Sequence, residues 1–141
     1  SNFVDMFRVM FSVTAHRDYR LDATLFPPEH ILEMATLGGA RAMNMEKQVG
    51  ALEKGKRADL IMLDITRPEW IPHHNIISNI VQSSSGDTVD FMMVDGEVIY
   101  EDRQIKTLDE KEVLKEANKA GLAIAKRTGL DYFGRSPWPM L

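Results

Sequence analysis

Four histidines are the side chains of this sequence best suited to bind a metal ion or to transfer a proton near neutral pH. His16 and His30 fall on two separate predicted helices, whereas His73 and His74 are adjacent in a predicted loop. A zinc site needs three or four converging ligands, and on a helix it uses a spacing such as H-E-x-x-H. Adjacent residues on an extended chain point to opposite sides, so His73 and His74 do not suit one ion. We therefore expect surface histidines and no metal ligand in this chain.

The other candidate groups also lack a catalytic pattern. Asp59 and Asp64 bracket an apolar run, where a metal pair is conceivable but turn and capping roles are much commoner for aspartates. The run Ser83–Ser85 lacks the G-x-S-x-G elbow of a nucleophilic serine. Gly38-Gly39 lacks the Lys-Ser/Thr ending of a phosphate loop and lies within a helical pattern. We therefore assign no catalytic residue to this chain.

The composition is that of a folded protein and excludes several kinds of partner. Its 141 residues suit one ordinary domain, with 44% hydrophobic and 27% charged residues. The net charge of −4 and the mixed signs argue against a nucleic-acid partner, and no apolar run approaches the ~20 residues of a membrane span. The absence of cysteine excludes disulfides and fits a cytoplasmic protein. Nine methionines fall mostly on apolar faces, which predicts core filling.

Two helices are predicted at the start of the chain. Apolar residues recur every three or four positions over Phe3–Arg17, and Pro27-Pro28 opens a second helix that ends near Asn44. Gly38 and Gly39 lie inside the second helix, where each costs roughly 1 kcal/mol relative to alanine. We expect a neighbouring backbone to pack closely against these glycines and offset that cost.

After Gly50 the pattern changes to short strands. The predicted segments are strands over Ala51–Glu53, Leu60–Leu63, Phe91–Val94 and Glu97–Tyr100, and helical turns within Asn75–Gln82. Asp95-Gly96 separates the last two strands and predicts a two-residue hairpin with a type I′ turn.

A third helix is predicted near the C-terminus. Thr107 and Glu110 have the spacing of a capping box, and Gly129 suits a left-handed C-cap. The proline-rich tail Asp131–Leu141 holds Trp138 and is expected to pack over a surface. The order of elements indicates an α+β domain, or the end of an α/β unit followed by a strand-rich cap.

Two long segments resemble the amidohydrolase superfamily. Met34–Met43 is similar to the A-T-x-x-G-A-x-A-L pattern of the helix that closes the family's barrel. Val49–Asp64 is similar to its I-G-S-L-E-x-G-K-x-A-D-L-I-x-L-D segment. Shorter matches follow in the family's order at Asn2–Phe7, His74–Val81 and Val89–Val98. In the second of these, Ile76 replaces the usual proline. The resemblance is to the subgroup of deaminases and chlorohydrolases that act on nucleosides, guanine, cytosine and s-triazines.

The resemblance implies a fold of class α/β plus β. Residues 1–48 would hold the last helices of a (β/α)8 barrel. Residues 49–106, with a loop over 65–90, would form the C-terminal share of a small β-sandwich built from both chain ends. Residues 107–141 would form a C-terminal helix and tail that pack on the barrel.

The resemblance also implies a mechanism whose main residues lie outside this chain. Family members use zinc or iron to activate water, which attacks an amidine or amide carbon of a cyclic small molecule. Their histidine and aspartate ligands would all precede Ser1, so no metal ligand is carried onto this sequence. Only Ser1 and Asn2 would lie near the substrate. We therefore expect the isolated chain to be inactive and to bind no metal.

Two interpretations of the chain as a whole stay open. It begins at Ser1-Asn2 without a methionine, which indicates a tag remnant or a segment of a longer hydrolase. Its partner would then be the N-terminal remainder of the same protein, in a homo-oligomer acting on a small-molecule substrate. Alternatively, the chain is a non-catalytic module that binds a partner through its barrel-closing apolar helix faces.

Overall fold

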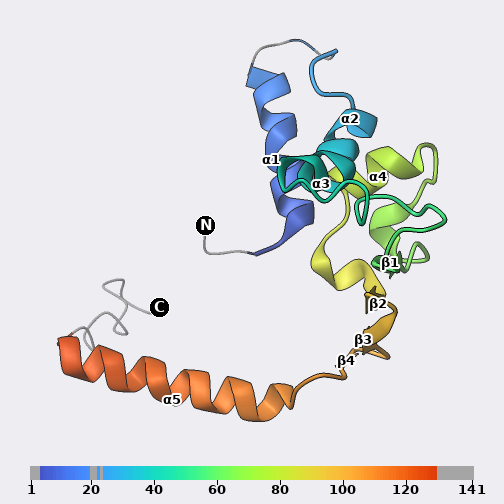
Figure 1. Ribbon diagram of the computed structural model, residues 1–141. Coiled ribbons are helices and arrows are strands. Elements are labelled where there is room, and N and C mark those ends of the chain that lie inside the picture. The colour runs from blue at the N-terminus through green and yellow to red at the C-terminus, as the bar shows by residue number, and fades with distance from the viewer. Residues whose placement is uncertain (1–3, 20–21, 23, 130–141) are drawn as a thin grey trace. The chain divides into compact units, whose positions relative to one another are not determined.

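A computed structural model describes residues 4–19, 22 and 24–129 of the chain (Figure 1). The chain divides into two compact units, Ser1–Gln104 and Ile105–Leu141. The first unit holds three helical segments and most of a small sheet, and the second holds one long helix.

Helix α1 (Met6–Tyr19) starts and ends later than the predicted Phe3–Arg17. The backbone N–H of Phe7 donates to the Asp5 carboxylate at 2.9 Å, so Asp5 caps the first turn. Phe7 and Met10 on the inner face of α1 are buried. They form the core of the first unit together with Ile31 and Val81.

The second helical segment is continuous but not uniform. It comprises α2 (Pro28–Glu33), the π-helical turn η1 (Met34–Gly38) and α3 (Gly39–Ala42). A Cβ on Gly38 would lie 3.2 Å from the Glu33 carbonyl oxygen, and one on Gly39 only 3.8 Å from the Met34 oxygen. The prediction that another segment packs against these glycines is therefore wrong for the described residues. The atoms nearest to them belong to the wider π-helical turn of their own segment.

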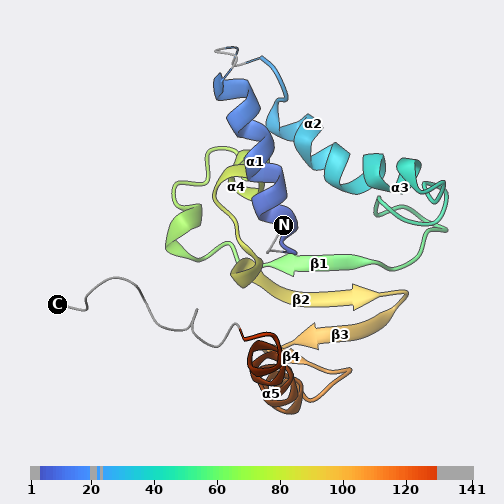
Figure 2. The same ribbon diagram turned by 90° about the vertical axis from the view of Figure 1, so that its left-hand side faces the viewer.

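Four strands form one sheet in the order β1-β2-β3-β4 (Figure 2). They are β1 (Leu60–Leu63), β2 (Val89–Val94), β3 (Glu97–Glu101) and β4 (Gln104–Ile105). β1 and β3 both pair antiparallel with β2. The predicted hairpin is confirmed, since Asp95 and Gly96 have φ values of 51° and 83°.

Two strands differ from the prediction. Ala51–Glu53 is irregular in the structure. The Arg57 N–H donates to the Gln48 carbonyl and the Lys56 N–H to the Glu53 carbonyl, so local turns use the backbone of this segment. β4 was missed because the turn before it, Asp102-Arg103, lacks glycine although both residues have positive φ.

The segment between β1 and β2 contains one predicted helix and two short 3-10 turns. α4 (Ile76–Gln82) is confirmed, with the Asn75 side chain accepting from the Ser78 N–H at 3.0 Å. The 3-10 turns are η2 (Pro68–Trp70) and η3 (Gly86–Thr88). Trp70 is fully buried, and a cis peptide bond joins Ile71 to Pro72.

The second unit is dominated by α5 (Glu110–Thr128). The Asp109 carboxylate accepts from the Glu112 N–H at 3.1 Å, so the cap lies two residues after the predicted Thr107. Gly129 is left-handed at the C-terminal end, with φ 68°, as predicted. Trp138 and its tail lie outside the described residues. No helix in the described part of the chain has the length and apolar character needed to cross a bilayer.

Candidate functional site

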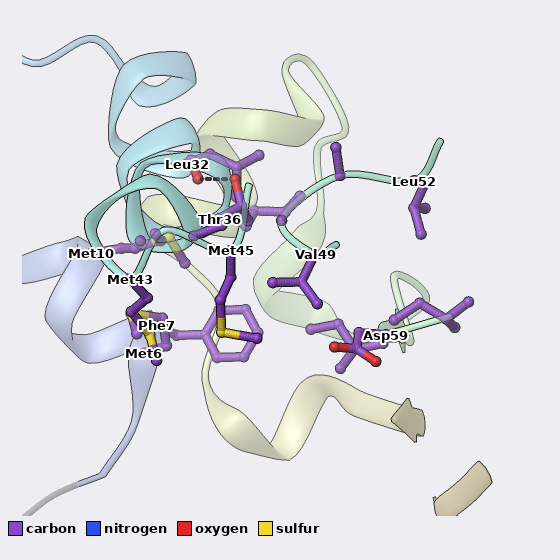
Figure 3. A pocket seen from close by; sticks show the side chains of 18 of the residues that line it. Met6, Phe7, Met10, Leu32, Thr36, Met43, Met45, Val49, Leu52 and Asp59 are labelled. Carbon is purple, nitrogen blue, oxygen red and sulfur yellow. Dashed lines mark hydrogen bonds between the residues drawn. The ribbon is translucent and has the colours of Figure 1, made fainter. Parts of the chain in front are cut away.

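An apolar groove of about 790 Å³ opens in the first unit (Figure 3). It lies among the start of α1, the helical segment that ends in α3, the loop after α3, and β1. We call it the α1–β1 groove. It forms because the loop from Met45 to Leu52 runs along the same side of the unit as α1 and β1.

The floor of the α1–β1 groove is core, and its rim is exposed. Phe7 and Met10 on the floor are 7% and 4% exposed. The rim residues Met6, Met43 and Ile61 are 53%, 70% and 44% exposed. The prediction that methionines fill the core is therefore wrong for Met6 and Met43 in this chain. An apolar rim of this kind is typical of a surface that another segment covers.

Gly50 fixes the position of the loop against α3. Its φ of +92° lies in the region that favours glycine, and an added Cβ would lie 2.8 Å from the Ala40 Cβ and 3.0 Å from the Leu37 Cα. The loop backbone can therefore lie in contact with the helical segment only because residue 50 has no side chain.

The α1–β1 groove carries little that could perform chemistry. Among its described lining residues, Thr36 and Asp59 have the polar side chains. The Thr36 hydroxyl donates to the Leu32 carbonyl at 2.8 Å. Asp59 Oδ1 accepts from the Asp95 N–H at 2.6 Å. Both polar groups are already hydrogen-bonded within the first unit, and the rest of the lining is apolar.

The histidines are dispersed across the first unit. The His16 ring lies 3.4 Å from the Ser12 carbonyl, and His73 Nε2 lies 2.9 Å from the Ile65 carbonyl oxygen. His30 stacks at a tilt against Phe26, with ring centroids 6.5 Å apart. Within residues 4–19, 22 and 24–129, no three histidine, aspartate or glutamate side chains are placed to hold a metal ion.

Asp64 has a turn role. The Thr66 hydroxyl and the Thr66 N–H both donate to Asp64 Oδ1, at 2.6 and 2.9 Å. These hydrogen bonds, the hydroxyl first, lower the pKa of the exposed Asp64 carboxyl below its usual 3.8. Asp64 therefore stabilises the turn to Thr66, whereas Asp59 accepts from the Asp95 N–H of the β2–β3 hairpin.

Ser1 and Asn2, predicted to lie near the substrate, are outside the described residues. Asp5, the first acidic residue of the sequence, caps α1 and lies 3.5 Å from the Arg8 Nε. Sequence patterns did not reveal the α1–β1 groove. Its lining comes from segments that are distant along the chain, and the apolar helix faces were the signal in the sequence that pointed toward it.

Comparison with known proteins identifies the family. The model of the amidohydrolase family matches residues 1–99. The chain belongs to the amidohydrolase family. The resemblance read from Met34–Asp64 is thereby confirmed. The amidohydrolases most similar in sequence include a 5-methylthioadenosine/S-adenosylhomocysteine deaminase of Thermoanaerobacter pseudethanolicus, 34% identical over 128 residues. They also include an S-triazine hydrolase of Gordonia rubripertincta, 38% identical over 130 residues.

The same fold is present in a solved amidohydrolase structure. An adenosine deaminase from Xanthomonas campestris, crystallised with bound zinc, matches with a TM-score of 0.82 and 26% sequence identity. The match covers 86% of this chain and 28% of the deaminase chain.

The chain spans about 30% of the length of the curated relatives. The matches cover 90% of this chain and 30% of the Thermoanaerobacter deaminase, and 89% of this chain and 27% of the triazine hydrolase. The relatives therefore carry a large part of their polypeptide beyond the region that this chain matches.

Proposed function

We propose that this chain is the C-terminal scaffold of a metal-dependent hydrolase that acts on non-peptide carbon–nitrogen bonds. The similarity to both a deaminase and a triazine hydrolase over about 90% of the chain supports the proposal. Both relatives are named for hydrolysis of nitrogen-rich small molecules. The substrate would be a cyclic amidine or amide of that kind.

The metal would be held outside this chain. The described residues do not fit a zinc or iron site, because their histidines are dispersed and Asp59 and Asp64 are engaged in turns. Zinc in the adenosine deaminase structure supports a metal in the complete protein. When bound, such a metal would supply an activated water.

The contribution of this chain would be positional. Residues 1–48 would supply the last barrel helices and residues 49–106 part of a β-sandwich, with Ser1 and Asn2 nearest to the substrate. The buried contact of Phe7 and Met10 with Ile31 supports a rigid start to the chain at that point. We further propose a homo-oligomeric, cytoplasmic enzyme whose partner for this segment is its own N-terminal remainder.

A non-catalytic module is the second candidate, and the exposed rim of the α1–β1 groove favours it. Met6 and Met43 would then contact a separate protein. The two candidates differ in what light scattering would show. A module is expected to associate when purified alone, whereas a well-behaved monomer of 16.0 kDa would contradict it.

The decisive experiment compares the complete protein with the 141-residue chain. Each is loaded with zinc and assayed for ammonia release from 5-methylthioadenosine and S-adenosylhomocysteine, and for hydrolysis of s-triazines. We expect turnover by the complete protein alone and its loss on chelation. Turnover by the isolated chain would show that the active site has been placed wrongly.

A further inference from the structure

The Asp5 carboxylate binds the first turn of α1 and also lies beside a second segment of the first unit. Oδ1 accepts from the Phe7 N–H at 2.9 Å and from the Arg8 N–H at 3.4 Å. Oδ2 lies 3.5 Å from the Arg8 Nε and would lie 4.0 Å from a Cβ added to Gly86. The Asp5 side chain is 19% exposed, so its neighbours cover most of the carboxylate.

The turn η3, which begins at Gly86, is firmly held where it approaches Asp5. Thr88 at the end of η3 is fully buried, and its hydroxyl donates to the Ser85 carbonyl at 2.6 Å. The Asp64 N–H donates to the Thr88 carbonyl at 2.8 Å, and η3 leads directly into β2. Asp5 therefore connects the start of α1 to a turn that buried contacts fix to the sheet.

Asp5 follows closely on the residues that the proposed function places nearest to the substrate. Three peptide units separate it from Asn2, and a chain advances at most about 3.6 Å per residue, so the two residues lie within about 11 Å of each other. The cap sets where this short segment joins α1 and in which direction it leaves the helix. A displacement of about 1 Å at the reacting groups can lower a rate about 100-fold. An anchor three residues away is close enough to affect the geometry of the reaction.

We propose that Asp5 is a positioning residue of the hydrolase. Its carboxylate fixes the start of α1 beside η3 and thereby holds Ser1 and Asn2 in the orientation that the reaction requires, without touching the substrate itself. The inference rests on the proposed function, which places Ser1 and Asn2 near the substrate.

Three variants of the complete protein separate positioning from helix stability. Asp5→Ala removes the cap of α1. Asp5→Asn keeps an acceptor for the Phe7 N–H, because asparagine caps helices about as well as aspartate. Asn75→Ala is the matched control, since it removes the side chain that accepts from the Ser78 N–H at 3.0 Å and caps α4 in the same unit. If Asp5→Ala does not fold, Asp5→Gly takes its place, because glycine is tolerated better than alanine at a helix N-cap.

Steady-state hydrolysis by the zinc-loaded variants, with kcat and KM measured separately, tests the role in the reaction. We expect Asp5→Ala to lower kcat at least about tenfold and to change KM less than about threefold, because misplaced reacting groups weaken the transition state and not the binding of substrate. Asp5→Asn should recover most of this loss. Asn75→Ala should keep its kcat although its melting temperature falls about as far as that of Asp5→Ala. Equal losses of kcat in the two alanine variants would overturn the proposal, and so would a loss confined to KM.

Amide hydrogen exchange of the same samples allows the two proposals to fail separately. We expect Asp5→Ala to speed exchange at the amides of residues 2–4 at least about tenfold, and Asn75→Ala to leave it unchanged. That pattern in a complete protein that hydrolyses none of the tested compounds supports the anchoring by Asp5 and refutes the proposed function alone. Exchange at residues 2–4 that is the same in Asp5→Ala and in the wild type refutes the positioning role, whether or not the enzyme is active.

Discussion

At the scale of single residues, Gly50 has the most sharply defined role in this structure. It combines a positive φ with van der Waals contact to Ala40 and Leu37. Gly55 is a natural control, because its φ of +94° is almost the same but nothing lies within 4 Å of an added Cβ. The pair separates backbone strain from steric overlap.

We expect Gly50→Ala to lower the free energy of unfolding by about 3 kcal/mol, from left-handed strain and overpacking together. Gly55→Ala bears the strain alone and is expected to cost about 1 kcal/mol. Urea unfolding of both variants measures the difference. Equal losses would mean that the loop shifts away from α3 without penalty.

A second prediction at this scale concerns Asp64 and pH. Its carboxyl pKa is lowered from 3.8 in the folded state, chiefly by the Thr66 hydroxyl, so folding favours the ionised form. This stabilisation is present above about pH 3.8 and is lost as pH falls through the lowered folded pKa. The stability difference between wild type and Asp64→Ala should therefore shrink below pH 3.8.

Urea titrations at pH 7 and pH 3 measure this shrinkage. Thr66→Val removes the largest cause of the shift and should weaken the pH dependence. A difference between wild type and Asp64→Ala that stays constant with pH would show that the turn does not select the carboxylate.

At the scale of elements, the sequence pattern predicted helix α5 but misplaced its N-terminal cap. Thr107 and Glu110 satisfy the spacing of a capping box, yet Asp109 caps α5. Both threonine and aspartate are good caps, so the spacing alone does not choose between them. The local backbone chooses, since Asp109 is extended, with φ −84° and ψ 98°, directly before the first helical residue.

Alanine substitution distinguishes the two caps of α5. Asp109→Ala should lower helix stability by about 1 kcal/mol, because the Glu112 N–H loses its acceptor. Thr107→Ala should change it by less than about 0.5 kcal/mol, as expected for a surface position outside the cap. Thermal unfolding followed by circular dichroism at 222 nm measures both. A larger loss of helix stability in Thr107→Ala than in Asp109→Ala would show that Thr107 caps α5.

The π-helical turn η1 is a second feature that the sequence patterns did not predict. Periodicity correctly predicted a helix across Gly38-Gly39. It did not reveal the wider turn, because a π-helical turn shifts the phase of a helix without breaking its apolar face. The glycines are explained by that turn for the residues that the structure describes.

At the scale of the whole molecule, the chain consists of a helix-and-sheet unit and a separate helical unit, described independently. The α1–β1 groove gives the first unit an apolar surface, and the proposed function places the chemistry of the family outside this chain. A metal that binds only the folded state raises stability in proportion to the logarithm of its concentration. The isolated chain has no described group of ligands through which zinc could act in this way.

We therefore expect zinc to leave the melting temperature of the 141-residue chain unchanged, and chelation to lower that of the complete protein. Differential scanning fluorimetry over a zinc titration measures both, with magnesium as a control for ionic strength. Specific stabilisation of the isolated chain by zinc would show that its histidines converge on a metal site after all.

The sequence by itself determined the family, the main helices and the Asp95-Gly96 hairpin. Each depends on local patterns: an ordered set of motifs, a helical period, or a two-residue turn whose φ values glycine permits. It also predicted turn or capping roles for Asp59 and Asp64, and in the structure Asp64 accepts from Thr66 while Asp59 accepts from the Asp95 N–H.

Only the tertiary structure decided where the apolar surface of this chain lies. The α1–β1 groove is lined mainly by α1, the helical segment ending in α3, the loop after α3, and β1. The exposure of Met6, Met43 and Ile61 depends on which segments cover them. The type of a hydrophobic residue does not tell whether its side chain lies in a core or on an exposed face. Burial is a property of the assembled neighbours, and those are set by the tertiary structure.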